Sequence, residues 1–484
     1  MRIILNPYLL TILSGILLLL SFPPFNLHFL VWIALVPFLY AILNIKKEFK
    51  NKIPLLGGLL GIIFYFGSLY WLFAIFKSFA IILILILCTY LYLYAFILNF
   101  MLSKSENKFT ILYLPSILWI AIEYIKSEGW WLKFSWMNLG YSQHNFLPIL
   151  QFASIFGQYG LSFLIVLVNS VIIFLIINRK RKLVRNTLII FSLLSTAILL
   201  FGYNSLKETY NPPIKVGLVQ DESSEFPVYE SLSKQLPNDV NFILWPEYAV
   251  PEFLDENTEL LTRISNLTKA KNSYLILGSM DESETYSREV KANAMGKLGY
   301  PEDIIKKTFK YHNTAYLFSP EGVNLGRYYK MNPIQFFADG VAGKSFSVFE
   351  TTFGDIGIMI CYDTDYSYVA RNLVKNGAQL LFIPNYDSIQ WSELQHKQHS
   401  AMTSMRAVEN RRFIARSSTS GISQIIDPKG RITNTIELSK SGITTGFIEA
   451  IDAKTFYTNY GFVLPYICTA FSLIFVVCMF IRKK

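Results

Sequence analysis

The distribution of long apolar runs is the feature that most constrains how this chain can fold. Residues 8–204, and again 460–481, carry stretches of hydrophobic residues close to the roughly 20-residue length that a helix needs to cross a bilayer. Residues 205–455 between them have the composition of a soluble domain. Hydrophobic residues make up 52% of the chain and its mean hydropathy is +0.36, more than a soluble globular protein usually carries. We therefore predict a membrane protein whose helices bracket one globular domain.

The apolar runs divide the chain into three predicted parts. A multi-pass membrane domain of about seven transmembrane helices takes residues 1–204, a globular domain takes 205–458, and a C-terminal transmembrane helix takes 459–484. The eight expected spans are 8–22, 27–44, 55–77, 80–103, 109–127, 159–178, 187–204 and 460–481.

Basic residues predict which side of the membrane each loop faces. They cluster between the second and third spans (Lys46, Lys47, Lys50, Lys52), between the fourth and fifth (Lys104, Lys108), and between the sixth and seventh (Arg179 to Arg185). Under the positive-inside rule these loops are cytoplasmic. Seven spans then carry the globular domain to the opposite face, which in a bacterium with two membranes is the periplasmic side of the inner membrane. The formal charge of +10 is explained by these blocks, so we exclude nucleic-acid binding.

The globular domain alternates short β-rich runs with helical stretches, which predicts a layered α/β domain. The expected strands are 214–220, 242–246, 274–280, 313–319, 346–351, 355–361, 380–385, 412–418, 423–427 and 442–449. The expected helices are 228–239, 255–270, 365–376 and 391–410.

Cys361 ends one of these apolar strands, in the run Gly357-Ile358-Met359-Ile360-Cys361-Tyr362-Asp363. The other three cysteines lie in apolar segments, so the globular domain cannot form an internal disulfide. An unpaired thiol in an oxidising compartment invites damage, which favours a chemical use over simple packing. We therefore treat Cys361 as a candidate nucleophile.

Two further side chains have the chemistry that a reactive thiol needs. A thiol is mostly protonated at neutral pH, and Glu247, after the apolar run Phe242-Ile243-Leu244-Trp245-Pro246, is a candidate base. Lys330, after Gly326-Arg327-Tyr328-Tyr329, is a candidate for stabilising an oxyanion, with the backbone N–H of Tyr362 as its partner. Spacing alone cannot bring the three positions together.

The motifs around these positions resemble those of the apolipoprotein N-acyltransferases, membrane members of the nitrilase (carbon–nitrogen hydrolase) superfamily. The resemblance covers nearly the whole chain: Trp-Pro-Glu, the later Lys and Cys-Tyr-acid occur in the family's order. The other matching segments are Phe22-Pro23-Pro24-Phe25, the run from Trp136 to Gln143, and Met405-Arg406-Ala407-Val408-Glu409.

This resemblance implies an α-β-β-α sandwich with Glu247 as general base, Lys330 as oxyanion stabiliser and Cys361 as nucleophile. It also implies the reaction. An acyl chain passes from a phospholipid, commonly phosphatidylethanolamine, to the thiol as a thioester, and then to the α-amine of the diacylglyceryl-cysteine of an apolipoprotein. No metal and no other cofactor is implied.

The chain departs from the family pattern after the lysine. The family usually has a second Glu eight residues beyond it, where this chain has Ala338, and Asp339 is the candidate substitute. The acid after Cys-Tyr is Asp363, where the best-known members have Glu. The resemblance assigns Tyr362, Asp363, Trp245 and Trp136, with Asp339, to substrate binding or to the oxyanion.

Two alternative functions remain open from the sequence. The same triad could serve a membrane-tethered amidase with water as acceptor, or the altered segment after Lys330 could mark a catalytically weakened homologue that binds lipid. His396 and His399 are three residues apart on a predicted helix, but no carboxylate or cysteine cluster completes a metal site. Arg406 and Glu409 are expected to pair within that helix.

Overall fold

The computed structural model describes residues 6–105, 107, 109–178, 180–282, 311–337 and 339–481. Of the residues named above, Lys108, Arg179 and Ala338 lie outside the described residues. The chain forms two compact units, one of residues 1–208 with 460–484 and the other of residues 209–459. Each is described by itself below.

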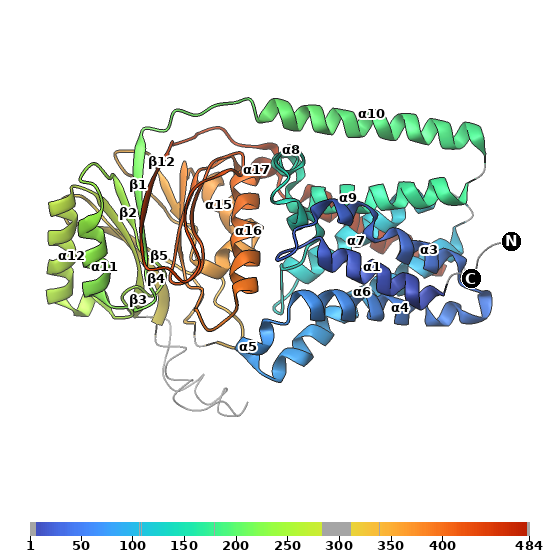
Figure 1. The fold of residues 1–484 in the computed structure, drawn as a ribbon, viewed down its shortest axis with the longest axis horizontal. Coiled ribbons are helices and arrows are strands. Elements are labelled where there is room, and N and C mark those ends of the chain that lie inside the picture. Colours follow the sequence, from blue (N-terminus) through green and yellow to red (C-terminus); the bar gives the residue numbers. More distant parts are fainter. Residues whose placement is uncertain are drawn as a thin grey trace. The chain divides into compact units, whose positions relative to one another are not determined.

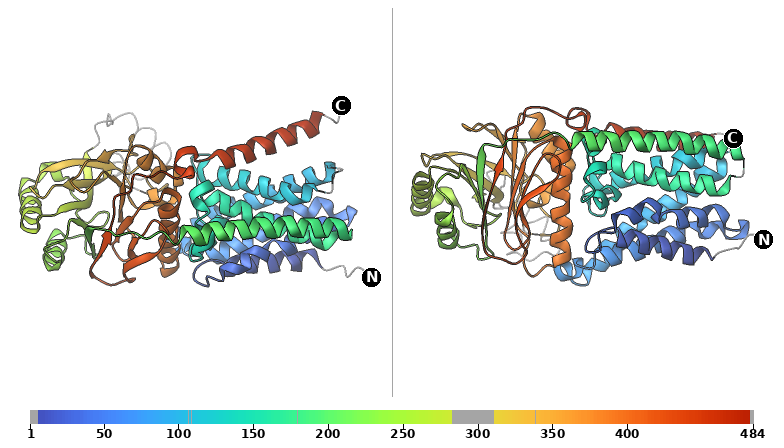
Figure 2. Two further views of the ribbon diagram at one scale, coloured as in Figure 1. Left: turned by 90° about the horizontal axis from the view of Figure 1, so that it is seen from above. Right: turned by 45° about the horizontal axis from the view of Figure 1, so that its top comes forward.

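The first unit is helical, and its helices run alongside one another (Figure 2). Its α-helices are α1 (Pro7–Leu20), α2 (Val31–Ala34), α3 (Val36–Asn44), α4 (Ile53–Gly61), α5 (Leu72–Phe76), α6 (Phe79–Lys104), α7 (Thr110–Glu128), α8 (Leu147–Leu150), α9 (Ala153–Ile177), α10 (Arg181–Ser205) and α18 (Val463–Ile481). Within the described residues, four helical segments are long and apolar enough to cross a membrane: Glu48–Phe66, Phe79–Lys104, Ala153–Ile177 and Arg181–Ser205. Pro7–Leu20, His28–Asn44 and Val463–Cys478 are shorter apolar helices, so the count of eight spans stays a prediction.

Close backbone approaches and buried polar groups hold these helices together. A Cβ on Gly57 of α4 would lie 2.2 Å from the carbonyl oxygen of Leu91 on α6, so only glycine allows the two helices this contact. The side chain of Asn169 on α9 accepts from the backbone N–H of Leu35 at 2.8 Å and donates to the carbonyl of Val31 at 3.0 Å. In an apolar surrounding such bonds fix the position of one helix against another.

An aromatic segment after α7 is attached to that helix by buried charged side chains. Lys126 donates to the carbonyl of Trp136 at 2.7 Å, and Glu123 accepts the backbone N–H of Leu139 at 2.9 Å. Glu123 also accepts the indole N–H of Trp119 at 3.2 Å. Both charges are therefore used to hold backbone and ring groups of their own unit.

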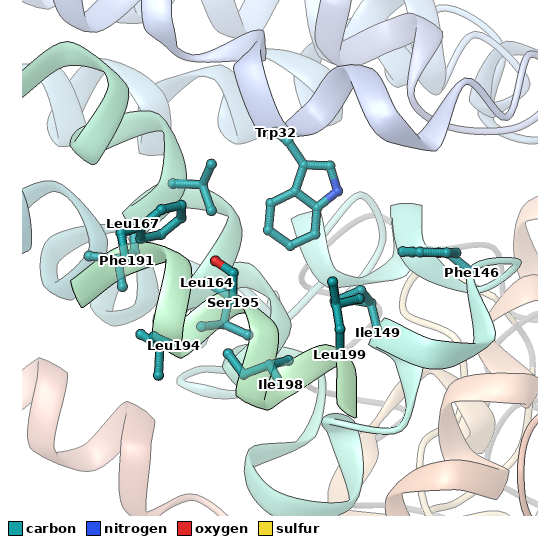
Figure 3. Close-up of a pocket in the computed structure, with 11 residues that line it drawn as sticks. Trp32, Phe146, Ile149, Leu164, Leu167, Phe191, Leu194, Ser195, Ile198 and Leu199 are labelled. Atoms are coloured by element: carbon teal, nitrogen blue, oxygen red, sulfur yellow. The ribbon is translucent and has the colours of Figure 1, made fainter. Parts of the chain in front are cut away.

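A cavity of about 300 Å³ lies within the same unit, beside α10 (Figure 3). Ser195 is the one residue with a hydroxyl group in its lining. The remaining lining residues are Trp32, Phe146, Ile149, Leu164, Leu167, Val168, Phe191, Leu194, Ile198 and Leu199.

The second unit is a four-layer α-β-β-α sandwich, with α11 (Phe226–Gln235) and α12 (Thr258–Lys271) outside one sheet and α15 (Ser367–Lys375) and α16 (Glu393–Asn410) outside the other (Figure 1). The first sheet has the order β12-β1-β2-β3-β4-β5 and the second the order β11-β10-β9-β8-β7-β6. The strands are β1 (Ile214–Gln220), β2 (Phe242–Leu244), β3 (Tyr274–Glu282), β4 (Tyr311–Phe318), β5 (Asn324–Tyr329), β6 (Val348–Phe349), β7 (Ile356–Ile358), β8 (Leu380–Asn385), β9 (Ile414–Ser418), β10 (Ser423–Ile426), β11 (Ile432–Ile436) and β12 (Gly442–Ile448). The short helix α17 (Phe456–Tyr460) follows.

Alternation along the strands divides the core of this unit in two. Phe242 and Leu244 of β2 point into the core between the sheets, whereas Ile243 and the following Trp245 pack beneath α11 and α12. Successive side chains of a strand face opposite sides, and a strand covered on both faces is mostly apolar. The short central strand β2 is therefore apolar at every position.

The predicted fold class, a helical region followed by an α/β domain with two sheets, is confirmed; two strands, however, were not predicted. β5 was missed because Asn324, Gly326 and Arg327 interrupt its alternation, and β11 because it is polar and largely exposed. Both are edge strands, which bury one side at most and therefore carry weak hydrophobic patterns.

Candidate active site

Three strand ends deliver the predicted catalytic side chains. Glu247 follows β2 and Lys330 follows β5, both strands of the first sheet, whereas Cys361 follows β7 of the second. β7 runs parallel to β8, so their carboxyl ends lie at one edge of the second sheet. The site therefore draws side chains from both sheets of the sandwich.

Lys330 lies between two carboxylates. Its ammonium is 2.8 Å from Oε1 of Glu247 and 2.7 Å from Oδ2 of Asp339. Only 1% of the lysine side chain is exposed. A buried ammonium is costly unless it is paired, so these contacts fix both its charge and its position.

Two neutral side chains orient the carboxylates. The side-chain amide of Asn313 in β4 donates to Oε1 of Glu247 at 2.6 Å and to Oδ1 of Asp339 at 2.7 Å. The hydroxyl of Tyr248 donates to the same oxygen of Asp339 at 3.0 Å. Asp339 thus shares Lys330 with Glu247 although it comes one residue later than the family's second Glu.

The charged groups of this cluster shift one another's pKa values. Burial lowers the pKa of Lys330, but the carboxylates of Asp339 and Glu247 outweigh it, so the pKa lies well above its usual value. Burial raises the pKa of Glu247; Lys330 opposes this shift and Asp339 adds to it. Lys330 is therefore a permanent cation, and Glu247 is a stronger base than an exposed carboxylate.

Cys361 is buried and begins the 3₁₀ turn Cys361–Asp365 with a backbone φ of 46°. The left-handed region costs a side-chain-bearing residue about 1 kcal/mol or more, so surrounding contacts must hold it there. Its thiol lies 3.5 Å from the carbonyl oxygen of Tyr386, to which it donates. Burial raises the pKa of Cys361, the charge of Glu247 adds to the rise and that of Lys330 opposes it. The resting group is a neutral thiol that needs a base.

Asp363 connects the cysteine turn to the strand that carries the lysine. Its carboxylate accepts the backbone N–H groups of Met331 and Asn332, at 3.2 and 2.8 Å, and the N–H of Ile360 at 3.2 Å. The hydroxyl of Tyr328 also donates to it, at 3.2 Å. These bonds tie the residues beside Lys330 to the residue before Cys361.

The structure places the remaining predicted binding residues in different surroundings. Tyr362 is buried next to Cys361, with its ring 5.1 Å from that of Tyr366. Trp245 lies in the core under α11, where its indole donates to Ser233 at 2.8 Å. Trp136 belongs to the helical unit, with its ring 4.6 Å from that of Trp71. Their binding roles stay predictions.

Sequence reasoning missed Asn313 and Tyr248. Asn313 had a usable signal, because every residue of β4 is buried and an amide inside a buried strand must find a partner. Tyr248 had none, since tyrosine side chains lie both at surfaces and in cores.

The remaining sequence predictions concern metal binding and an ion pair on α16. Among the described residues no group of three or more His, Cys, Asp or Glu side chains could hold a metal ion. Arg406 and Glu409 do form the expected pair on α16, and both are fully buried.

Comparison with known proteins identifies both parts of the chain. Residues 14–171 match the family described as the apolipoprotein N-acyltransferase N-terminal domain, and residues 213–455, half of the chain, match the carbon–nitrogen hydrolase family. The chain belongs to the apolipoprotein N-acyltransferase family, within the carbon–nitrogen hydrolase superfamily. The resemblance read from the motifs is thereby confirmed.

Full-length relatives of the family cover nearly all of this chain. The apolipoprotein N-acyltransferase of Geobacter metallireducens is 28% identical, over 99% of this chain and 96% of its own length. That of Chlorobaculum tepidum is 22% identical over 100% and 98%. A carbon–nitrogen hydrolase from Helicobacter pylori, of known crystal structure, matches 48% of this chain and 88% of its own at 18% identity and a TM-score of 0.38.

Proposed function

We propose that this protein transfers a fatty acyl chain from a membrane phospholipid, through a thioester on Cys361, to the N-terminal α-amine of diacylglyceryl-cysteine in apolipoproteins. Membership of the family makes the protein an N-acyltransferase of lipoprotein maturation. The single observation that carries the mechanism is the buried Lys330 held between Glu247 and Asp339 beside a neutral, buried thiol.

In the first half-reaction, Glu247 accepts the thiol proton while the sulfur of Cys361 attacks the ester carbonyl of the donor. The tetrahedral intermediate carries a negative charge on oxygen, which the ammonium of Lys330 stabilises. When the intermediate collapses, the C–O bond to the glycerol breaks, and Glu247 returns its proton to the leaving alkoxide. A lysophospholipid departs and the acyl group remains on sulfur.

In the second half-reaction the amine of the acceptor attacks the thioester carbonyl. Lys330 again stabilises the oxyanion, and Glu247 takes a proton from the attacking amine. The C–S bond breaks, the proton passes to the sulfur, and the amide product leaves. Two bulky substrates thus use one nucleophile in turn.

The membrane placement is part of the proposal. Basic loops on one side of the apolar helices support a bacterial inner-membrane protein with residues 205–458 in the periplasm, in three parts bounded at 204/205 and 458/459. We take phosphatidylethanolamine as the donor, with the acyl chain at sn-1 leaving.

The test is mass spectrometry of the full-length protein after incubation with vesicles of phosphatidylethanolamine and phosphatidylglycerol. The expected result is a hydroxylamine-sensitive acyl adduct on the Cys361 peptide, absent from Cys361→Ala. Adding a diacylglyceryl-cysteine peptide should discharge the adduct and place the acyl chain on the peptide's amine.

Two outcomes would overturn the proposal. Discharge to free fatty acid, with none on the peptide, would make the protein a hydrolase of the amidase type. A folded protein that forms no adduct would be a lipid-binding homologue without this activity.

A further inference from the structure

A second cluster of buried charged side chains lies in the α/β unit, outside the groups assigned to the reaction. It consists of Asp365, Asp387, His399 and Arg416, and none of these is more than 2% exposed. Charged side chains are almost never this buried unless they are paired. None of the four takes part in the proton transfers or the oxyanion contacts described above.

His399 has a carboxylate at each of its ring nitrogens. Nδ1 is 2.9 Å from Oδ1 of Asp387, and Nε2 is 3.3 Å from Oδ1 of Asp365. A neutral imidazole has one N–H and can donate to only one of them, whereas an imidazolium can donate to both. Two carboxylates therefore favour the charged ring, which has a hydrogen bond to Asp387 at Nδ1 and an ion-pair contact with Asp365 at Nε2.

The remaining contacts fix Asp387 from the other side. Arg416 in β9 donates to Oδ2 of Asp387 at 2.6 Å and to the carbonyl of Ile422 at 2.7 Å. Gln395 donates to Oδ1 of Asp387 at 3.0 Å. Asp387 consequently cannot move without breaking several buried bonds.

The two aspartates lie on the two segments that surround the thiol. Asp365 is the last residue of the turn that Cys361 begins. Asp387 directly follows Tyr386, whose carbonyl accepts the Cys361 thiol. His399 thus links the loop that orients the thiol, by a hydrogen bond to Asp387, with the turn that bears the nucleophile, by an ion-pair contact with Asp365.

We infer that His399 is a positioning residue whose imidazolium, bridging Asp365 and Asp387, holds Cys361 in its strained left-handed turn and in register with the Tyr386 carbonyl. Asp363 holds the same turn toward Lys330, so the nucleophile is fixed on two sides. This inference rests on Cys361 as the nucleophile of the proposed function, but not on the identity of the acyl donor.

The charge of the bridge depends on pH in a definite direction. The groups facing His399 are Asp365, Asp387, Arg416 and His396. Burial lowers the pKa of His399, but the two carboxylates outweigh it and raise it to about 9. The raised value means that the bridge is intact at neutral pH and is lost as the pH rises through about 9.

The test compares His399→Gln with the wild type by the rate at which iodoacetamide alkylates Cys361, followed on the Cys361 peptide of the full-length protein. This readout needs no lipid, so its failure is separate from a failure of acyl transfer. We expect the variant to react about tenfold more slowly at neutral pH, because the thiolate is the reactive form and a thiol out of register with Glu247 loses the base that takes its proton.

The ratio of the two rates should approach one above about pH 10, where the wild type has also lost its bridge. If His399 acted only through contacts that do not depend on its charge, His399→Gln would lower the alkylation rate equally at every pH. His396→Gln is the matched control, since His396 lies on the same helix and its Nε2 is 3.0 Å from the carbonyl oxygen of Ser388 instead of between two carboxylates. Its ratio to the wild type should not change with pH.

The double variant Asp365→Asn/His399→Gln keeps the inference falsifiable if the single variant folds poorly. It removes the unpaired carboxylate and offers amide hydrogen bonds, so it should recover to within about threefold of the wild-type rate at neutral pH. A rate ratio for His399→Gln that is independent of pH, or no recovery in a folded double variant, would overturn the inference.

Discussion

The two units of this protein each bury a Glu and a Lys, and they use them differently. In the helical unit, Glu123 and Lys126 bond to backbone and indole groups of the aromatic segment that follows α7. In the α/β unit, Lys330 bonds to the carboxylates of Glu247 and Asp339. Residue types and burial are the same in both places, so neither identifies a reaction centre.

The bonding partners make the difference. A charge that is bonded to backbone groups has a fixed structural task, and changing its protonation would break a chain contact. Charges that are bonded to one another beside a thiol can exchange protons and stabilise a new negative charge while the fold stays intact. Substitutions in the two pairs should therefore differ both in the property that they change, stability or the reactions of Cys361, and in the size of the change.

Lys330→Met should have the largest effect. It removes the oxyanion charge and leaves two buried carboxylates without their cation, so thioester formation should fall by about 10²–10³-fold or more and stability by about 3–5 kcal/mol. Adduct formation on Cys361 and thermal unfolding measure the two. Lys397→Met on the surface of α16 is the control, and it should change stability by less than about 0.5 kcal/mol.

Glu247→Gln should lower the rate of thioester formation by about 10²–10⁴-fold through loss of the base. In the wild type the base must be deprotonated, and its raised pKa means that the rate falls with decreasing pH at a higher pH than an exposed Glu would give. The residual activity of the variant should not show this fall in rate at low pH. If the variant showed the same fall, another group would be the base. Glu256→Gln, at an exposed position, is the control.

Asp339→Asn should have a milder effect and lower the rate of thioester formation by about tenfold. The amide keeps a hydrogen-bonding oxygen, and Glu247 still pairs with Lys330. The pKa of Lys330 should fall because one of its two carboxylates is gone. If thioester formation fell as far as in Lys330→Met, Asp339 would contribute as much to catalysis as Lys330.

Lys126→Met should have the smallest effect on the thiol. The buried Trp136 carbonyl loses its donor, which should cost about 1–3 kcal/mol of stability. Alkylation of Cys361 by iodoacetamide should stay within about twofold of the wild type, because the reagent tests only the α/β unit. Equal losses in Lys126→Met and Lys330→Met would contradict the distinction between the two pairs.

Much of the fold was predictable because most positions in the buried strands are apolar. β1 and β8 begin and end where the sequence places them: Ile214–Gln220 is apolar except for Lys215 and its last residue, and Leu380–Asn385 is apolar except for its last residue. β5 was not predicted, and it is the strand that leads to Lys330. Its position is set by antiparallel pairing with β4, where Thr314 is opposite Tyr329, and such pairing leaves no local pattern.

The candidate site was predictable in its residue types but not in its connections. Asp339 pairs with Lys330, and no spacing rule predicts that contact. His396 and His399 were weighed as metal ligands on a predicted helix, yet that helix is buried along nearly its whole length. The carboxylate partners of His399 lie in the turn that ends at Asp365 and in the loop at Asp387, 12 residues before the histidine, and only the folded chain brings all three together.

The order of the strands also bears on how the protein is made. The first sheet, which carries Glu247 and Lys330, has β12 as an edge strand paired with β1 along its whole length. Residues 442–448 leave the ribosome after every other strand of the unit. The first sheet thus stays incomplete until the end of the domain has been synthesised, and a nascent or truncated chain lacks the strand that pairs with β1.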